Sequence, residues 1–372
     1  MIRLVLWGDG ESPHLLKWAR ALAPRVELFA ASSRGFAAAF DALVPADRRL
    51  ALGHDVHFSG GNFGLLKALP RFAQWLKQVE PDWINAHYLT SHGTLAWMAR
   101  RLGVSAQLAG SAWGSDILVA PERSAALRWA TQRVLRDCAI ATSDSAHMSE
   151  RMRELGARQV LTFPFGLEAM PPEPPPKLKE PRRFFANRGL EDIYDPMRVL
   201  RVFAVVAGAW PEARLVVAND GSLQPALRAR ASELGLADRI EFVGRLDPAA
   251  QAEQYARARW YLSLPRSDSV SVSVIEAMAH GCVPLLSDLP ANRELVRDTD
   301  NGLVLTPENE ADLLAALERL APRADLIARA NRIWVRSSAM FGPSVDQFVA
   351  HLRSLTPPAA LARRSVPPRP EA

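Results

Sequence analysis

The sequence is poor in cysteine and contains no long apolar run. Its two cysteines among 372 residues, Cys138 and Cys282, lie in apolar contexts, and we interpret them as buried thiols rather than a disulfide or a metal site. No apolar run approaches the ~20 residues needed to cross a bilayer. The N-terminal stretch "MIRLVLWGDG" is typical of a first β-strand and not of a signal peptide. We therefore expect a cytoplasmic protein, either free or bound at the inner face of the membrane.

Signals for several kinds of site are also missing. The sequence has no Cys/His cluster, no Walker loop and no nucleophile elbow. The Asp-x-Asp pattern at 298–300 precedes an Asn-Gly pair typical of a turn, and we interpret it as a solvated loop rather than a metal site. We therefore expect neither a metal nor a cofactor.

Positive charge is in slight excess, and most of the excess lies in the first half. The net charge is +5, and residues 1–168 contain 19 Lys and Arg against 15 Asp and Glu. An arginine-rich proteome would explain this excess, and so would a domain that contacts an anionic membrane or a lipid-linked acceptor. The segment 123–137 combines apolar residues with four arginines, Arg123, Arg128, Arg133 and Arg136. A membrane-docking surface and an ordinary crossover helix both explain this segment. We expect no nucleic-acid partner.

Short apolar runs alternate with helix-like segments in both halves of the chain. Examples are "IRLVLWG", "PDWINAH" and "CAIATS" in the first half, and "ARLVVANDG", "WYLSLPRS" and "CVPLLSD" in the second. This alternation predicts an α/β fold with parallel sheets and crossover helices. We expect two doubly wound Rossmann-like domains that face each other across a cleft, with ligands at the carboxyl ends of the strands.

A proline-rich segment sets the expected domain boundaries. Residues 169–182 contain six prolines and little that could be buried, which is typical of a linker. The predicted parts are a first domain at 1–168, the linker at 169–182, a second domain at 183–337, a helix at 338–355 and a disordered tail at 356–372.

The stretch "LPRSDSVSVSVIEAMAHGCVPLLSD", residues 264–288, resembles a known motif. In retaining GT-B glycosyltransferases of family four (bacterial group 1), Glu-Gly-Phe-Gly precedes an acid-Ala-Met-Ala helix, Gly-x-Pro-Val and a strand. The chain up to about residue 355 resembles this family, also in "GDGESPHLLKWARALA", "PDWINAHYLTSHGTLAWMA" and "SAWGSDIL". The resemblance implies the GT-B fold, with the helix at 338–355 crossing back onto the first domain.

The resemblance also implies an activity. A hexose-type sugar would move from a UDP- or GDP-sugar to a hydroxyl of a glycan or glycolipid, without a metal and with retention, in the synthesis of bacterial cell-surface material such as lipopolysaccharide or exopolysaccharide. Front-face displacement is implied, in which the leaving diphosphate helps to deprotonate the acceptor. Two alternatives remain: a GT-B sugar-nucleotide epimerase or hydrolase, and a catalytically silent scaffold that binds a nucleotide-sugar.

Two carboxylates eight positions apart, Asp268 and Glu276, are the first catalytic candidates. The sequence Ser273-Val-Ile-Glu276 predicts a capping box, which is a sufficient structural reason for Glu276. The resemblance implies instead that Glu276 holds the ribose hydroxyls of the donor. It also implies that Asp268 reaches the hydroxyls of the donor sugar, although the family has the longer glutamate there. A solvated loop acid is the alternative for Asp268.

Arg188 is the third catalytic candidate, because the resemblance implies that it neutralises the diphosphate. The family's accompanying lysine would fall near Ile193 or Tyr194. Arg266 and Arg293 are considered as replacements for it, although each is also explained as a surface arginine. The family's glycines are replaced by "SVSV". Backbone amides at the start of the following helix are nevertheless expected to face the diphosphate, in residues Ser269, Ser271, Val272 and Ser273.

The remaining candidates are grouped by the part of the substrate that they would contact. Gly8 and Gly10 are expected in a loop after the first strand, near the diphosphate. Strand ends in the second domain are expected to hold the base and ribose, through Asn219, Gly221 and Arg245. The residues expected to face the acceptor or the sugar are Asp9, His14, His87, Trp113 and Asp116. An ordinary turn, a structural histidine and a core tryptophan are the alternatives for this last group.

Overall fold

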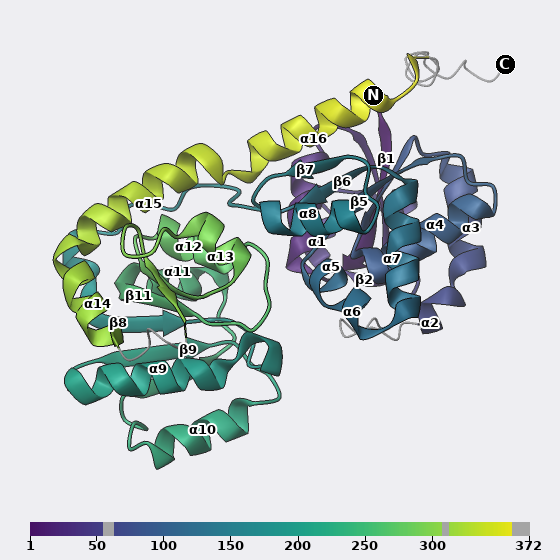
Figure 1. The fold of residues 1–372 in the computed structure, drawn as a ribbon. Helices are drawn as coiled ribbons and strands as arrows, with labels where there is room; N and C mark the ends of the chain where they lie inside the picture. Colours follow the sequence, from purple (N-terminus) through teal and green to yellow (C-terminus); the bar gives the residue numbers. More distant parts are fainter. Residues whose placement is uncertain (55–62, 307–311, 359–372) are drawn as a thin grey trace. The chain divides into compact units, whose positions relative to one another are not determined.

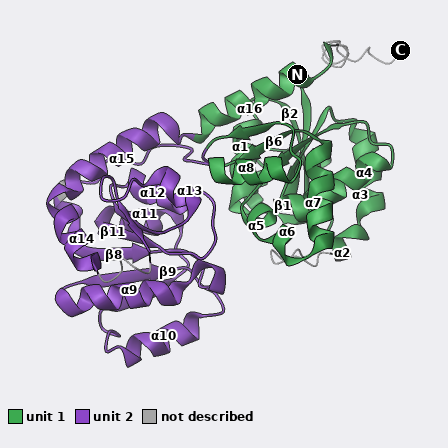
Figure 2. Ribbon diagram, viewed as in Figure 1, with its two compact units in different colours: residues 1–163, 341–372 green, residues 164–340 purple. Residues whose placement is uncertain are grey.

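The computed structural model describes residues 1–54, 63–306 and 312–358, and the chain divides into two compact units (Figures 1 and 2). Unit 1 comprises residues 1–163 and the chain from Phe341 onward, and unit 2 comprises Pro164–Met340. Each unit contains a parallel sheet with helices, so the predicted α/β fold of two doubly wound domains is confirmed.

Unit 1 is built on a parallel sheet in the strand order β3-β2-β1-β4-β5-β6-β7. The strands are β1 (Arg3–Gly10), β2 (Glu27–Phe36), β3 (Arg49–Ala51), β4 (Trp83–His87), β5 (Gln107–Ser111), β6 (Cys138–Ser143) and β7 (Val160–Thr162). The helices between them are α1 (Pro13–Leu22), α2 (Phe63–Leu66), α3 (Leu69–Val79), α4 (Thr94–Arg101), α5 (Ser115–Leu118), α6 (Ala120–Arg123), α7 (Ala125–Asp137) and α8 (Ala146–Glu154). Strands buried on both faces explain the nearly continuous apolar runs in the sequence.

Serine side chains define where several of these helices begin. Ser12 accepts a hydrogen bond from the amide of His14, and Pro13 occupies the first turn of α1. Ser124 and Ser145 cap α7 and α8 in the same way. Each cap satisfies an amide that the helix itself leaves without a partner.

The C-terminal helix α16 (Phe341–Leu355) packs on unit 1. The Trp18 ring of α1 lies edge-on to Phe341 and Phe348, with centroid distances of 5.1 and 5.4 Å. The Trp83 indole donates a 2.8 Å hydrogen bond to the hydroxyl of Thr356. The predicted helix start at 338 is wrong, because Ser338 ends the preceding helix α15. The predicted tail is wrong at Thr356, which is buried; residues 359–372 lie outside the described part of the chain.

Unit 2 contains a second parallel sheet, in the order β10-β9-β8-β11-β12-β13. Its strands are β8 (Glu180–Ala186), β9 (Arg214–Ala218), β10 (Ile240–Gly244), β11 (Ala258–Ser263), β12 (Val283–Ser287) and β13 (Leu303–Leu305). Its helices are α9 (Pro196–Ala209), α10 (Gln224–Glu233), α11 (Pro248–Arg257), α12 (Val272–Ala279), α13 (Pro290–Leu295), α14 (Leu313–Leu320) and α15 (Ala324–Ser338).

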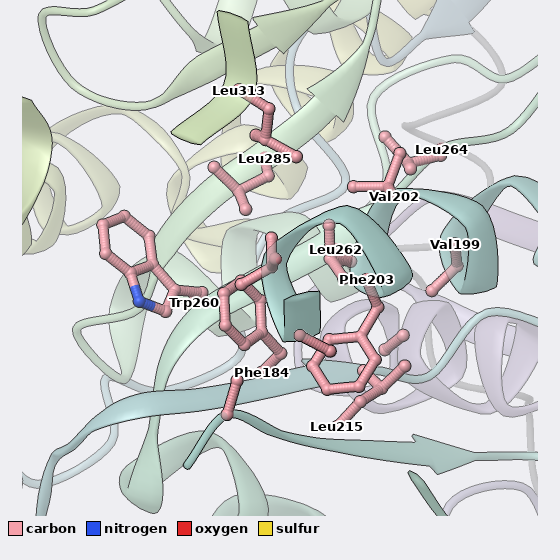
Figure 3. Close-up of a cluster of buried hydrophobic side chains, with 14 of the residues drawn as sticks. Phe184, Val199, Val202, Phe203, Leu215, Trp260, Leu262, Leu264, Leu285 and Leu313 are labelled. Atoms are coloured by element: carbon pink, nitrogen blue, oxygen red, sulfur yellow. The ribbon is translucent and has the colours of Figure 1, made fainter. Parts of the chain in front are cut away.

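The core of unit 2 includes side chains of β8, β11 and α9 that pack against one another (Figure 3). The Phe184 ring of β8 stacks on Trp260 of β11 at 6.1 Å and lies edge-on to Phe203 of α9 at 5.7 Å. All three side chains are fully buried. Burial of each is worth roughly 1.5–3 kcal/mol, which stabilises the packing of these two strands against α9.

The predicted linker at 169–182 differs from the structure. The whole segment belongs to unit 2, and residues 180–182 are the first part of β8. Lys179 is buried, and its ammonium donates hydrogen bonds to the carbonyl oxygens of Tyr255 and Ala258 at 2.8 and 2.7 Å. Burial lowers the pKa of Lys179. Its six prolines made the whole segment resemble a linker, and composition alone does not indicate that its last residues pack in unit 2.

Gly166→Ala is expected to lower the free energy of unfolding by about 2–3 kcal/mol, because the added methyl group would have to push the neighbouring backbone aside. A Cβ at Gly166 would lie 1.7 Å from the carbonyl oxygen of Ala339. The matched control is Gly208→Ala, which meets nothing within 4 Å on α9 and should raise stability by roughly 0.5–1 kcal/mol. Thermal unfolding checks both, and an unchanged midpoint for Gly166→Ala would contradict the close approach.

Candidate functional site

The main cluster of polar side chains in unit 2 lies where β8 and β11 end. β8 is followed by Asn187 and Arg188, and β11 is followed by the loop 264–271 and helix α12. The two strands are parallel neighbours, so their carboxyl ends meet at the same edge of the sheet. Residues far apart in the sequence are thereby brought into contact.

The structure brings three of the predicted site residues, Asp268, Ser271 and Ser273, together around the guanidinium of a fourth, Arg188. Arg188 Nη2 lies 2.6 Å from Asp268 Oδ2. Arg188 Nη1 donates hydrogen bonds to the hydroxyls of Ser271 and Ser273, the latter at 3.2 Å. The ring of Tyr194 covers the guanidinium at 4.6 Å, so an aromatic face occupies a position where the family's lysine was expected.

Charge is retained on Arg188 despite its burial. Burial alone would lower the pKa of Arg188, but the carboxylate of Asp268 and nearby tyrosines raise it above its ordinary value. Burial raises the pKa of Asp268, and Arg188 opposes that rise. A planar guanidinium next to serine hydroxyls suits an anion with several oxygens, such as a phosphate.

Glu276 does not form the predicted capping box. The N-cap of α12 is Ser271, whose side chain makes no capping hydrogen bond, so Ser273 and Glu276 are the second and fifth residues of the helix. Ser273 instead accepts a hydrogen bond from Arg188. Glu276 Oε2 lies 3.1 Å from the Tyr255 hydroxyl and 3.2 Å from Gln251 Nε2. The carboxylate is therefore held by α11 and not by the start of its own helix.

A buried hydrogen-bond network, which the sequence analysis missed, connects Glu276 to the residue before Arg188. Asn187 Nδ2 donates to the Tyr255 hydroxyl at 2.8 Å, and the Tyr261 hydroxyl donates to Asn187 Oδ1 at 2.6 Å. Burial raises the pKa of both tyrosines, so both hydroxyls keep their protons. The position of Asn187 beside Arg188 was the one signal that could have indicated this network.

The other predicted donor residues differ in their surroundings. Asn219 follows β9 with a φ of 83°, and its side chain donates to the carbonyl of Asn187 at 3.4 Å. At Gly221, a Cβ would lie 2.4 Å from the carbonyl oxygen of Leu190. Arg245 is exposed and pairs with Asp220 at 2.8 Å. The Ser269 amide donates to the side chain of Asp268, whereas Val272 is the first residue of α12.

The two arginines considered as a second cation lie on the surface, each matched by carboxylates. Arg266 pairs with Asp192 and Asp195 at 2.9 and 3.2 Å. Arg293 pairs with Asp288, where one of its two contacts is 2.7 Å. These contacts support the interpretation of both as surface arginines.

In unit 1, the expected loop at Gly8, Asp9 and Gly10 is wrong, because these residues are the last three of β1. A Cβ at Gly8 would lie 2.7 Å from Leu15, and one at Gly10 would lie 2.5 Å from the carbonyl oxygen of Gly35. The glycines therefore permit close packing. Asp9 is buried and pairs with Arg34 at 2.6 Å.

Three aromatic rings gather at the ends of β4 and β5. Trp113 Nε1 donates a 3.1 Å hydrogen bond to Nδ1 of His87, and the Trp113 ring lies 4.7 Å from that of the exposed His14. The other ring nitrogen of His87, Nε2, lies 3.2 Å from Nδ2 of Asn85. Burial lowers the pKa of His87 well below its ordinary value.

Asp116 shapes the loop after β5. Its carboxylate accepts hydrogen bonds from the amides of Trp113 and Leu89 at 2.9 and 2.8 Å. The side chain is fully buried, and burial raises its pKa to about 6. Asp116 is thus directed at the backbone that carries Trp113, which fits a positioning role better than contact with a sugar.

Over the described ranges, no three His, Cys, Asp or Glu side chains are grouped as a metal site would require. At the Asp-x-Asp pattern, Asp298 accepts a hydrogen bond from the amide of Val304, in agreement with a loop. Cys138 and Cys282 are free and buried, as predicted. None of the helices in the described part of the chain has the length and apolar character needed to cross a membrane.

Comparisons with known families match both units. Residues 3–145 match the family model "Glycosyl transferase 4-like", and residues 170–331 match "Glycosyl transferases group 1". The second match includes Arg188, Asp268 and Glu276.

Relatives and solved structures agree with these matches. The chain is 28% identical over 153 residues to an alpha-monoglucosyldiacylglycerol synthase of Streptococcus pneumoniae, covering 40% of this chain and 34% of the relative. It is 31% identical over 140 residues to a phosphatidyl-myo-inositol mannosyltransferase of Mycolicibacterium smegmatis, covering 36% and 35%. Both matches therefore span about a third of the relative's length.

The fold is similar over nearly the whole chain to that of Anabaena Alr3699/HepE, solved in complex with UDP and glucose. The TM-score is 0.78 at 15% identity, with 95% of this chain and 100% of that chain covered. This likeness shows the GT-B fold. The two family matches, which cover residues 3–145 and 170–331, show that the chain belongs to the group 1 glycosyltransferases.

Proposed function

We propose that this protein is a retaining, metal-independent glycosyltransferase that transfers a hexose-type sugar from a nucleoside-diphosphate sugar to a hydroxyl of a glycan or lipid-linked acceptor. The observation that carries the proposal is the convergence of Arg188, Asp268 and Glu276 at the carboxyl edge of the unit 2 sheet. A cation and two carboxylates match the diphosphate, sugar and ribose of such a donor.

Each group has a distinct part in donor binding. Glu276 accepts hydrogen bonds from the ribose hydroxyls, at ~1.5–3 kcal/mol for each bond to a charged group. Tyr255 and Gln251 orient its carboxylate beforehand. Arg188 and the first amides of α12 receive the diphosphate, since a helix N-terminus favours negative charge. Asp268 accepts hydroxyls of the sugar.

Catalysis then rests on charge stabilisation and orientation. The bond between the sugar carbon and the diphosphate oxygen breaks while the acceptor oxygen attacks from the same face. The acceptor hydroxyl gives its proton to the departing diphosphate oxygen. Arg188 stabilises the negative charge that develops on the diphosphate. Holding donor and acceptor in this geometry lowers the entropic part of the barrier.

Lipid-linked acceptors are favoured by the names of the relatives, a synthase of alpha-monoglucosyldiacylglycerol and a mannosyltransferase of phosphatidyl-myo-inositol. The positive charge of the first half of the chain suits an acceptor at an anionic surface. Within unit 1, Trp113 offers a partly exposed aromatic face beside His14, which suits stacking on a sugar. Such an enzyme would work in the cytoplasm at the inner face of the membrane, in the synthesis of cell-surface glycans.

A silent scaffold is the second candidate. The ion pair between Arg188 and Asp268 favours a scaffold, because each group partly neutralises the other and is then less available to stabilise charge on a substrate. A scaffold would bind a nucleotide-sugar without transferring it, so binding and turnover must be measured separately.

Donor binding is expected to raise the thermal unfolding midpoint with one family of nucleotide-sugars, UDP- or GDP-linked, in the presence of EDTA. Ligand at 100 times its Kd stabilises a protein by about 2.7 kcal/mol. The shift should disappear in Glu276→Ala and persist in Glu233→Ala, an exposed glutamate of α10. If no UDP- or GDP-sugar shifts the midpoint, the proposed donor site is wrong. Binding without transfer to any acceptor would favour the scaffold.

A further inference from the structure

Helices α4 and α7 lie side by side in unit 1 (Figures 1 and 2). Trp129 of α7 is 51% exposed, and its ring lies edge-on to that of Trp97 of α4 at 5.9 Å. Leu102, directly after α4, is 50% exposed. Large apolar side chains rarely gather on an exposed surface without a binding role.

Arginines surround these rings. The Arg133 guanidinium lies over the Trp129 ring at 5.4 Å, and that of Arg101 lies over the Trp97 ring at 5.7 Å. Arg136 is exposed on the same side of α7, three residues beyond Arg133. We define the Trp-Arg patch by six residues: Trp97, Arg101, Leu102, Trp129, Arg133 and Arg136.

Acidic residues in the same part of the chain are engaged elsewhere. Residues 94–137 contain three carboxylates, Asp116, Glu122 and Asp137. Asp116 is buried, Glu122 pairs with Arg128 and Arg151, and Asp137 pairs with Arg100. In the described ranges, no ion pair includes an arginine of the Trp-Arg patch. The patch therefore presents two guanidinium groups over its indole rings, and Arg136 adds an exposed charge on the same helix, with its side chain next to Gly156.

The role of α7 as a crossover helix explains only its inner face. Thr131, Val134 and Leu135 are buried against the sheet, and this packing does not require a tryptophan at 129. Arg128 pairs with Glu122, so it belongs to a surface ion-pair group and not to the patch. The outward side of the helix needs a separate explanation.

We propose that the Trp-Arg patch docks unit 1 on the surface of an anionic lipid bilayer. The half-exposed indole of Trp129 suits the level of the lipid headgroups, where tryptophan is enriched, whereas Trp97, whose Nε1 is buried, lies edge-on to it and supports it from the protein side. Guanidinium groups bind lipid phosphates through paired hydrogen bonds. The inference extends the proposed function, because an enzyme that uses a lipid-linked acceptor must meet its substrate at the membrane.

The test is sedimentation of the full chain with vesicles of phosphatidylcholine alone and of phosphatidylcholine mixed with phosphatidylglycerol. We expect binding to the mixed vesicles and little binding to the neutral ones, with a loss at high salt because the Debye length shortens. Arg133→Gln with Arg136→Gln should weaken binding roughly 25-fold, since each basic residue near an anionic surface contributes about fivefold. Trp129→Ser should weaken it as well.

The matched control is Arg128→Gln, which removes an arginine from the same helix but outside the Trp-Arg patch, and should leave vesicle binding unchanged. Equal binding to both kinds of vesicle, no binding, or equal loss in Arg128→Gln would overturn the proposal. Displacement of the protein from mixed vesicles by RNA at lower concentration would also overturn it, in favour of a nucleic-acid surface.

The donor thermal shift keeps this test separate from the proposed function. The patch variants should retain the shift, which also shows that they fold. Vesicle binding without any donor shift would support docking and contradict the donor site. A donor shift without vesicle binding would support the donor site and contradict docking on the membrane.

Discussion

Glu276→Ala is expected to abolish sugar transfer, and Glu276→Gln to reduce kcat/KM for the donor by about 10²- to 10⁴-fold. The physical reason is the loss of two hydrogen bonds to a charged group, each worth ~1.5–3 kcal/mol, where 1.36 kcal/mol corresponds to a factor of ten in rate. Initial rates with a labelled donor sugar measure the effect. The donor midpoint shift should be lost in parallel.

The stability of the same variants distinguishes a binding carboxylate from a helix cap. Glu276 lies beyond the first turn of α12 and accepts hydrogen bonds from Tyr255 and Gln251. The free energy of unfolding without donor should therefore not fall by the ~1 kcal/mol that is typical of a lost cap. Unchanged transfer by Glu276→Ala would show that the donor is held elsewhere, and a lower midpoint with normal transfer would restore the structural role.

Arg188→Ala is expected to reduce transfer by about 10³-fold or more, because the charge on the leaving diphosphate loses its cation. Arg188→Lys should recover part of the activity, since an ammonium keeps the charge but not the planar fork. The control is Arg266→Ala, a surface arginine paired with Asp192 and Asp195, which should keep normal activity. Equal losses in the two alanine variants would contradict the assignment of Arg188.

Arg188→Ala should also destabilise the protein, because it leaves the largely buried Asp268 without its cation. Removing one partner of a buried pair costs roughly 3–5 kcal/mol, and less here because both side chains are partly exposed. Burial already raises the pKa of Asp268 above 3.8, and loss of Arg188 would raise it further. A carboxyl with a raised pKa binds more protons when folded, so the deficit should grow as pH rises above about 4.

The double variant Arg188→Ala with Asp268→Asn separates stability from catalysis. A neutral amide removes the buried charge, so the unfolding midpoint should partly recover while transfer stays low. Urea unfolding at two pH values, together with initial rates, checks both parts. Recovery of activity in the double variant would show that the single variant had failed because of misfolding.

Much of this protein could be predicted from the local sequence. The alternation of apolar runs and helical segments predicted two parallel α/β units. A strand that is buried on both faces is a continuous apolar run, and this pattern is visible in the sequence of the strand alone. The motif around Asp268 and Glu276, and Arg188 after a strand, also indicated the site. Arg188 follows β8 and the loop with Asp268 follows β11, and parallel packing places the ends of these strands at one edge.

Other features depended on contacts between distant segments. The N-cap of α12 lies at Ser271, because Ser271 retains an extended backbone while Arg188 binds the hydroxyls of Ser271 and Ser273. The side chain of Glu276 is oriented by Tyr255 of another helix, and this pairing leaves no local pattern. Arg266 also meets its carboxylate partners only through the fold.

The sequence by itself determined the kind of elements, their order and the residues with the chemistry of a donor site. The tertiary structure alone decided which of those groups meet, which are neutralised and which lie exposed. Trp129 shows the difference: its sequence context suits either a buried crossover helix or a membrane surface. Only the packing of α4 and α7 shows that its ring faces outward. Hydrophobic periodicity is a property of one short segment. Exposure and charge pairing instead depend on residues from distant segments, which become neighbours only when the chain folds.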